Sequence, residues 1–100
     1  SFPMDKFLFL GFPPTKNKRK KFFETLFNFQ YPVIFYESTH RILKALKEMS
    51  LICPEAEILV GQELTKKFER TYRGKVTEVM ALMEKSDRRG EFVVIVSCRH

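Results

Sequence analysis

The sequence predicts an α/β domain in which helices pack on a five-stranded mixed sheet, in the order β-α-β-α-β-β-α-β. Short runs of β-branched and aromatic residues recur along the chain, and most are separated by amphipathic segments with the period of a helix. The fourth run follows the third after a short polar stretch, which indicates a near hairpin. The last run is the most continuous apolar segment, which is typical of a central strand buried on both faces.

Each element follows from its own pattern. The five strands are expected at residues 7–10, 33–36, 56–61, 68–73 and 92–96. The three helices are predicted from apolar stripes at Phe22, Phe23, Leu26 and Phe27, at Ile42, Leu43, Leu46 and Met49, and at Val79, Met80, Leu82 and Met83. Ser38 or Thr39 is expected to cap the second helix, and Gly74-Lys75 is expected to end the fourth strand.

Length and charge limit the possible classes of protein. The chain has 100 residues and a formal net charge of +6, which suits one small domain and favours an anionic partner. Cys53 and Cys98 lack the spacing of a zinc site, and the apolar runs are too short for a membrane span. We therefore expect a cytoplasmic protein with reduced cysteines, no metal and no membrane contact.

The start of the chain also carries information. It begins at Ser1 rather than at a methionine, and residues 1–6 lack any periodic pattern. We expect residues 1–6 to be the end of a linker and residues 7–98 to form a domain excised from a longer protein.

Polar side chains gather where the predicted strands end. If the last two strands run antiparallel to the first three, the start of the last strand meets the carboxyl ends of the first three at one edge. That edge is where ligands bind in open α/β sheets. The candidate site at this edge comprises Gly11, Tyr36, Glu37, Gln62, Glu63, Leu64, Gly90 and Glu91.

Three of the polar residues fit two readings. Glu37, His40 and Arg41 are candidates for an acid–base catalytic cluster. Composition alone favours a structural arrangement instead, in which Glu37 and Arg41 form an i, i+4 ion pair and His40 helps to cap the helix. Glu63 with Thr65 and Lys66 fits either a polar-ligand site or the charged end of a hairpin, and both alternatives remain open.

Residues 15–21 carry five positive charges and no acid, at Lys16, Lys18, Arg19, Lys20 and Lys21. These side chains could hold nucleic-acid phosphates, or they could be a solvated entry to the first helix. Cations are electrostatically unfavourable at a helix N-terminus, which favours a binding role. No phosphate loop, dinucleotide glycine motif, metal-ligand spacing or Ser-His-Asp arrangement appears in the sequence.

Four segments together resemble a known family. They are residues 11–14 (GFPP) before the basic cluster, 33–43 (VIFYESTHRIL), 62–66 (QELTK) and 90–96 (GEFVVIV). In order and spacing they are similar to motifs of the bacterial ribosomal RNA small-subunit methyltransferase I group, the 16S rRNA cytidine 2′-O-methyltransferases. FYESTHR followed by ELTK is the specific part, and the resemblance covers nearly the whole chain. This group belongs to the tetrapyrrole (corrin/porphyrin) methylase superfamily.

The resemblance implies a fold and a function. The chain would be the C-terminal domain of a two-domain methyltransferase, with S-adenosylmethionine in the cleft between it and an N-terminal domain. Cofactor contacts are implied for Tyr36, Glu37, Glu63, Leu64, Gly90 and Glu91. Lys16, Lys18, Arg19, Lys20 and Lys21 would hold the rRNA of the small ribosomal subunit. The resemblance identifies no catalytic residue, so Glu37, His40 and Arg41 stay as candidates, and this fragment alone would be inactive.

The sequence departs from the family in two places, and two alternatives remain. Gln62 stands where the family usually has arginine, and the chain stops at residues 98–100 without the helical extension of some members. One alternative is a methylase of the same superfamily that acts on a corrin, a porphyrin or another small molecule. The other is a non-catalytic RNA-binding or dimerisation module. A homodimer and the identity of the modified nucleotide are left open.

Overall fold

The computed structural model describes residues 6–64 and 68–97. It has the predicted element order. The strands are β1 (Leu8–Gly11), β2 (Val33–Ser38), β3 (Glu57–Glu63), β4 (Phe68–Lys75) and β5 (Glu91–Val96). The helices are α1 (Arg19–Leu26), α2 (Ile42–Ile52) and α3 (Val76–Glu84). Predictions that concern residues 1–5, Thr65, Lys66 and Cys98 fall outside the described residues.

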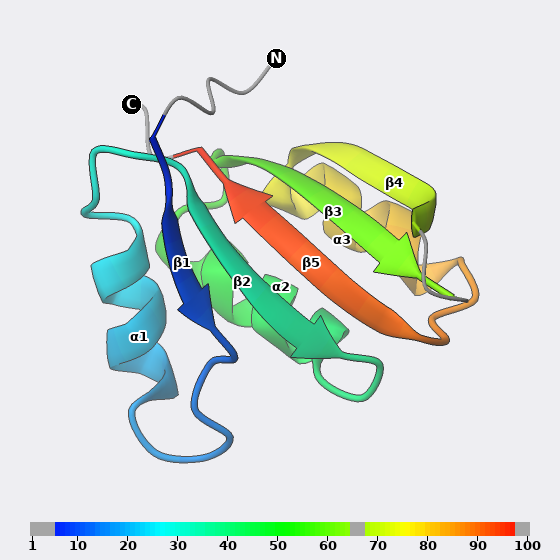
Figure 1. Cartoon of the computed structure of the whole chain (residues 1–100), viewed down its shortest axis with the longest axis horizontal. Helices are drawn as coiled ribbons and strands as arrows, with labels where there is room; N and C mark the ends of the chain where they lie inside the picture. Colours follow the sequence, from blue (N-terminus) through cyan, green and yellow to red (C-terminus); the bar gives the residue numbers. More distant parts are fainter. Residues whose placement is uncertain (1–5, 65–67, 98–100) are drawn as a thin grey trace.

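The strands form one mixed sheet in the order β1-β2-β5-β3-β4 (Figure 1). β1 and β2 are parallel, β5 is antiparallel to both of its neighbours, and β4 is antiparallel to β3. The first three strands therefore run in one direction and the last two run in the other. The α/β fold class and the central place of the last strand are confirmed, because the apolar run of β5 has a neighbour on each side.

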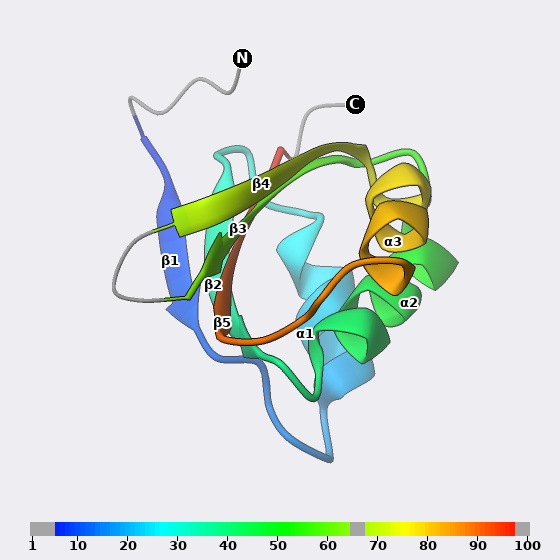
Figure 2. The same cartoon turned by 90° about the vertical axis from the view of Figure 1, so that its right-hand side faces the viewer.

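All three helices of the described residues lie on one face of the sheet (Figure 2). The core between the two layers is apolar, because alternate strand residues point into it. In β5 these are Phe92, Val94 and Val96, each at most 1% exposed. Phe23 of α1 packs edge-on against Phe35 of β2, with ring centroids 5.9 Å apart. Within the described part of the chain, no helix is both long enough and apolar enough to cross a membrane.

Two local predictions are wrong. β2 continues to Ser38 and α2 begins at Ile42, with Arg41 as an N-cap that lacks a side-chain capping bond. Thr39 does not cap the helix, because its hydroxyl donates a hydrogen bond to the Gly90 carbonyl. β4 does not end before Gly74, because its pairing with β3 continues to Lys75.

Candidate functional site

The carboxyl ends of β1, β2 and β3 meet the start of β5 at one edge of the sheet, which we call the rim. In the sheet register, Glu91 pairs with Ser38 of β2 and with Glu63 of β3. Figure 1 shows this edge at the lower right, where the arrowheads of β2 and β3 flank the start of β5. The predicted convergence of these strand ends is confirmed. The side chains at the rim determine whether it can bind a ligand.

A hollow of about 310 Å³ opens at the rim, on the sheet face that carries no helix. Its lining residues are Phe12, Tyr36, Glu63, Glu91, Phe92 and Val93. Tyr36 is 42% exposed, and its ring lies 5.1 Å from that of Phe9 and 5.6 Å from that of Phe12. The hollow thus combines an aromatic wall with two carboxylates, in the size range of small ligand pockets.

The two carboxylates of the hollow, Glu63 and Glu91, lie directly opposite each other in the antiparallel ladder. Like charges at such a position destabilise a sheet. Among the described residues, neither carboxylate forms an ion pair that would offset this cost. The pair is therefore unfavourable for folding and suited to a ligand that offers hydrogen-bond donors or positive charge. No group of three or more His, Cys, Asp or Glu side chains in the described residues could hold a metal ion.

The turn before β5 is held from two sides. Gln62 is fully buried, and its amide nitrogen donates to the carbonyls of Asp87 (2.8 Å) and Arg89 (2.7 Å). Thr39 donates to the Gly90 carbonyl from the opposite side. These bonds fix the position of Glu91 relative to Glu63. No anchoring role was predicted from the sequence for either residue: Thr39 was expected to cap a helix and Gln62 to line the rim, although Gln62 shares the spacing of the buried β3 residues.

Gly90 is required at the end of this turn. Its φ of 85° is a conformation that other residues rarely adopt. A Cβ atom at this position would collide with the carbonyl oxygen of Glu63 and lie 3.2 Å from Cδ2 of Leu64. Of the predicted cofactor contacts, Tyr36, Glu63 and Glu91 therefore line the hollow, while Gly90 and Leu64 pack beside it.

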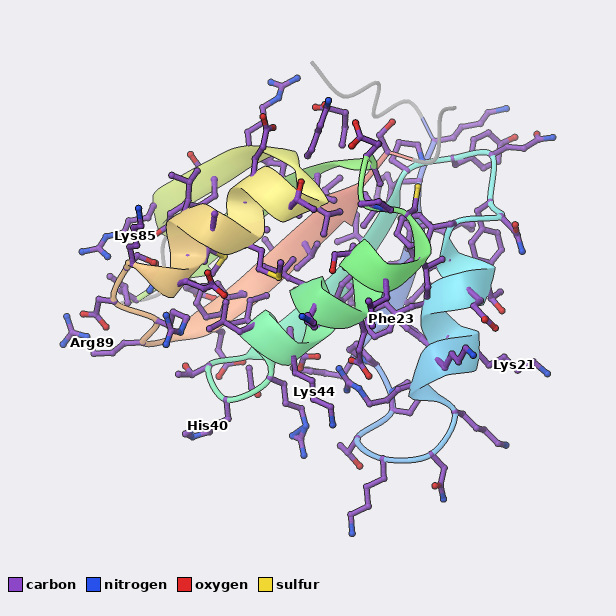
Figure 3. All side chains as sticks on the ribbon, turned by 180° about the vertical axis from the view of Figure 1, so that it is seen from behind. Lys21, Phe23, His40, Lys44, Lys85 and Arg89 are labelled. Atoms are coloured by element: carbon purple, nitrogen blue, oxygen red, sulfur yellow. The ribbon has the colours of Figure 1, made fainter. Side chains whose placement is uncertain are left out.

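Glu37, the remaining predicted cofactor contact, lies on the helix side of the sheet. It is 2% exposed, its Oε1 accepts a hydrogen bond from the backbone N–H of Ser38, and its Oε2 lies 3.5 Å from Nη2 of Arg19. Among the described residues, Glu37 forms an ion pair with Arg19 and none with Arg41. The i, i+4 ion pair considered in the sequence analysis is therefore not formed. Figure 3 shows His40 projecting outward from the turn between β2 and α2. The structure thus does not bring Glu37, His40 and Arg41 together as a catalytic cluster.

Arg19 is the centre of a buried ionic network. It is 3% exposed, and its guanidinium contacts Glu48 (Nη2 to Oε1, 2.8 Å), Glu37 and the carbonyl of Pro14 (2.7 Å). Burial alone would lower the pKa of Arg19. The hydrogen bond and charge of Glu48, followed by those of Glu37, outweigh burial and raise that pKa above its ordinary value. Arg19 ties the loop after β1 to β2 and α2, so it is not available to an external phosphate.

The four lysines of the basic segment differ from Arg19, because all of them are exposed. We call Lys16, Lys18, Lys20 and Lys21 the basic loop. Figure 3 shows Lys21 projecting away from α1. Lys18 is the N-cap of α1, with a φ of 70° and no side-chain capping bond, and the first turn of the helix contains no acid. Within the described residues, the lysines of the basic loop form no ion pair.

Curated proteins resemble this chain along almost its whole length. Ribosomal RNA small subunit methyltransferase I of Thermotoga maritima is 33% identical over 96% of the chain, and that of Bacillus subtilis is 41% identical over 90%. The chain spans only 43% and 31% of the length of these two relatives. No protein-family model matches the sequence.

Solved structures show the same fold. A cobalt precorrin-4 methyltransferase superposes with a TM-score of 0.61 and 12% identity, over 92% of this chain and 40% of that one. Uroporphyrin-III C-methyltransferase from Thermus thermophilus, solved with S-adenosylhomocysteine, gives a TM-score of 0.58 and 12% identity, over 97% of this chain and 47% of that one. The chain therefore has the fold of these methyltransferases, and over nearly its whole length its sequence is similar to a part of the ribosomal RNA small subunit methyltransferase I proteins.

Proposed function

We propose that this chain is the C-terminal half of an S-adenosylmethionine-dependent methyltransferase that methylates the ribose 2′-hydroxyl of a cytidine in 16S rRNA. The observation that carries the proposal is the hollow at the rim. Tyr36, Glu63 and Glu91 come from three different strands, and they surround one ligand-sized space. The names of the relatives support methyl transfer to small-subunit ribosomal RNA, and the ribose 2′-hydroxyl of a cytidine is what the family resemblance implies.

The chemistry of the hollow fits the adenosine end of the cofactor. Carboxylates at strand ends accept hydrogen bonds from ribose hydroxyls in nucleotide-binding folds, and Glu63 and Glu91 would accept them here. The rings of Phe12 and Tyr36 offer an apolar surface to an adenine. When bound, S-adenosylmethionine supplies a methyl group on a positively charged sulfur. The two negative charges of the rim favour that charge.

The chain's contribution to the reaction is binding and orientation. Methyl transfer to a hydroxyl requires the oxygen to lie in line with the methyl group and the sulfur, so positioning accounts for much of the acceleration. The basic loop would bind phosphates of the rRNA and hold the acceptor ribose at the rim. None of Glu37, His40 and Arg41 is placed among the rim carboxylates, and we assign no base to this chain.

The other half of the cofactor cleft is proposed to come from an N-terminal domain of the full-length protein. The solved relative with S-adenosylhomocysteine is more than twice as long as the part matched here. On this basis the isolated chain is inactive. Because its substrate is ribosomal, the cytoplasm is the proposed location.

The test uses the full-length protein, S-adenosylmethionine with an isotopically labelled methyl group, and small ribosomal subunits that lack the modification. Label in a 2′-O-methylcytidine of 16S rRNA is the expected result, and subunits that already carry the modification serve as the control. Transfer to uroporphyrin III instead of rRNA would keep the fold and replace the substrate. RNA binding with no methyl transfer and no affinity for S-adenosylhomocysteine would identify a non-catalytic module.

A further inference from the structure

A second hollow lies away from the rim, between the edge strand β1 and helix α1. Its volume is about 320 Å³, and its apolar lining, which we call its floor, consists of Leu10, Pro14, Phe22 and Phe29. Its other lining residues, which we call its border, are Lys18, Lys21 and Thr25. Figure 1 shows α1 beside the β1 edge of the sheet, where the strand has no further neighbour. We call this space the β1–α1 hollow.

The floor of this hollow is rigid and aromatic. Phe22 is half-buried, and its ring is held edge-on by Phe23 (5.1 Å, 89°) and Phe35 (6.0 Å, 87°). The side chain is therefore fixed by the core on one side while it lines the hollow on the other. A fixed ring offers a stacking surface at low entropic cost.

The backbone at the border of the hollow is strained. Lys18 is the only non-glycine residue of the described structure with a positive φ, at 70°. Glycine or asparagine would adopt this conformation more easily, and an N-cap residue normally contributes a side-chain bond that Lys18 does not make. Folding therefore does not explain a lysine at this position. Strain of this kind indicates that the residue serves a function.

We propose that the β1–α1 hollow takes one unstacked nucleobase of a single-stranded rRNA segment, with Lys18 and Lys21 on the flanking phosphates. The proposal rests on the proposed function, which it deepens by naming where the RNA is held. Charge complementarity favours RNA, because cations border the apolar floor and among the described residues no acid lines the hollow. The volume lies near the lower end for ligand pockets. Bases splayed from single strands stack on aromatic side chains in this way.

The test measures binding of a fluorescein-labelled, single-stranded oligouridylate to the full-length protein, together with the melting temperature of each variant. Lys18→Gly relieves the backbone strain and removes the cation. We expect an unchanged or higher melting temperature, weaker binding, and a slope of log affinity against log salt that is smaller by about 0.7. The control is Lys47→Asn, which removes one positive charge from the exposed side of α2. Glycine is not used at this position because it would destabilise the helix.

The aromatic floor is tested by Phe29→Leu, which keeps an apolar side chain and removes the stacking face. We expect affinity for the oligouridylate to fall by about 5- to 150-fold, the range for loss of one stacked base. Affinity for inorganic polyphosphate, which has no base, should stay the same. Phe7→Leu, an exposed phenylalanine outside the hollow, is the control.

The proposal is overturned if Phe29→Leu binds oligouridylate as the unchanged protein does, or if Lys18→Gly binds it with an unchanged salt slope. It is also overturned if an acidic peptide displaces the RNA and binds more tightly than the RNA does. If the two variants show none of these binding changes while the full-length protein still methylates ribosomal subunits, the proposed function stands, and only the base-binding role of the hollow is rejected.

Discussion

Replacing Arg19 by methionine removes the cation at the centre of the buried ionic network. Glu37 would then remain 2% exposed with no positive partner, whereas Glu48, at 25%, can turn to water. Breaking a buried pair by removing one partner costs about 3–5 kcal/mol. A domain of this size has a free energy of unfolding of about 5–15 kcal/mol, so the loss is a large fraction of the total.

The assay is urea denaturation of the full-length protein, followed by circular dichroism. At a slope of about 2 kcal/mol per molar, a loss of about 4 kcal/mol lowers the unfolding midpoint by about 2 M. Lys20→Met is the matched control, because it removes an exposed cation from the same helical turn and should change stability by less than about 0.5 kcal/mol.

The double variant Arg19→Met/Glu37→Met should recover most of the loss, because apolar replacement of both partners of a buried pair is often neutral. Our account of the network would be refuted if the single and double variants were equally destabilised. It would also be refuted if Arg19→Met behaved like Lys20→Met, since Arg19 would then act as a surface cation.

Two further predictions concern the turn before β5. Gly90→Ala should destabilise the protein by more than Gly11→Ala, although both glycines have positive φ, because an added Cβ meets the neighbouring strand at Gly90 and open space at Gly11. Backbone strain alone predicts about 1–2 kcal/mol for Gly11→Ala, and equal losses in denaturation would contradict the close approach. Gln62→Met should cost about 1–3 kcal/mol by leaving two carbonyls unpaired, measured against the exposed control Gln30→Met; no loss would show that the amide does not hold the turn.

The fold could be predicted because its signals are local and periodic. The strand and helix patterns each lie within about ten residues, and the apolar run of β5 is sufficient to place that strand in the middle of the sheet. Once strand directions were assumed, the rim followed from geometry alone. The wrong N-cap has a tertiary cause, because Thr39 bonds to a turn that is 51 residues away in the chain.

The burial of Arg19 and its ion pair with Glu48 were not predicted from the sequence, in which Arg19 was grouped with the exposed lysines. A run of cations looks uniform, but Arg19 lies four residues before Phe23 and so falls on the buried stripe of α1. Its guanidinium lies 5.5 Å from the Phe23 ring. That spacing was a usable signal. Its partner Glu48 lies 29 residues away on another helix, and no local pattern could have identified it.

The claim that the rim binds the cofactor is tested most directly by Glu91→Gln in the full-length protein. Calorimetry with S-adenosylhomocysteine should show about a tenfold or greater loss of affinity, because a hydrogen bond to a charged acceptor is lost. The free energy of unfolding should not fall, since the variant removes one of two opposed like charges. Glu84→Gln, at the exposed end of α3, is the control. Unchanged affinity, or a loss that only follows a loss of stability, would contradict the assignment of the rim.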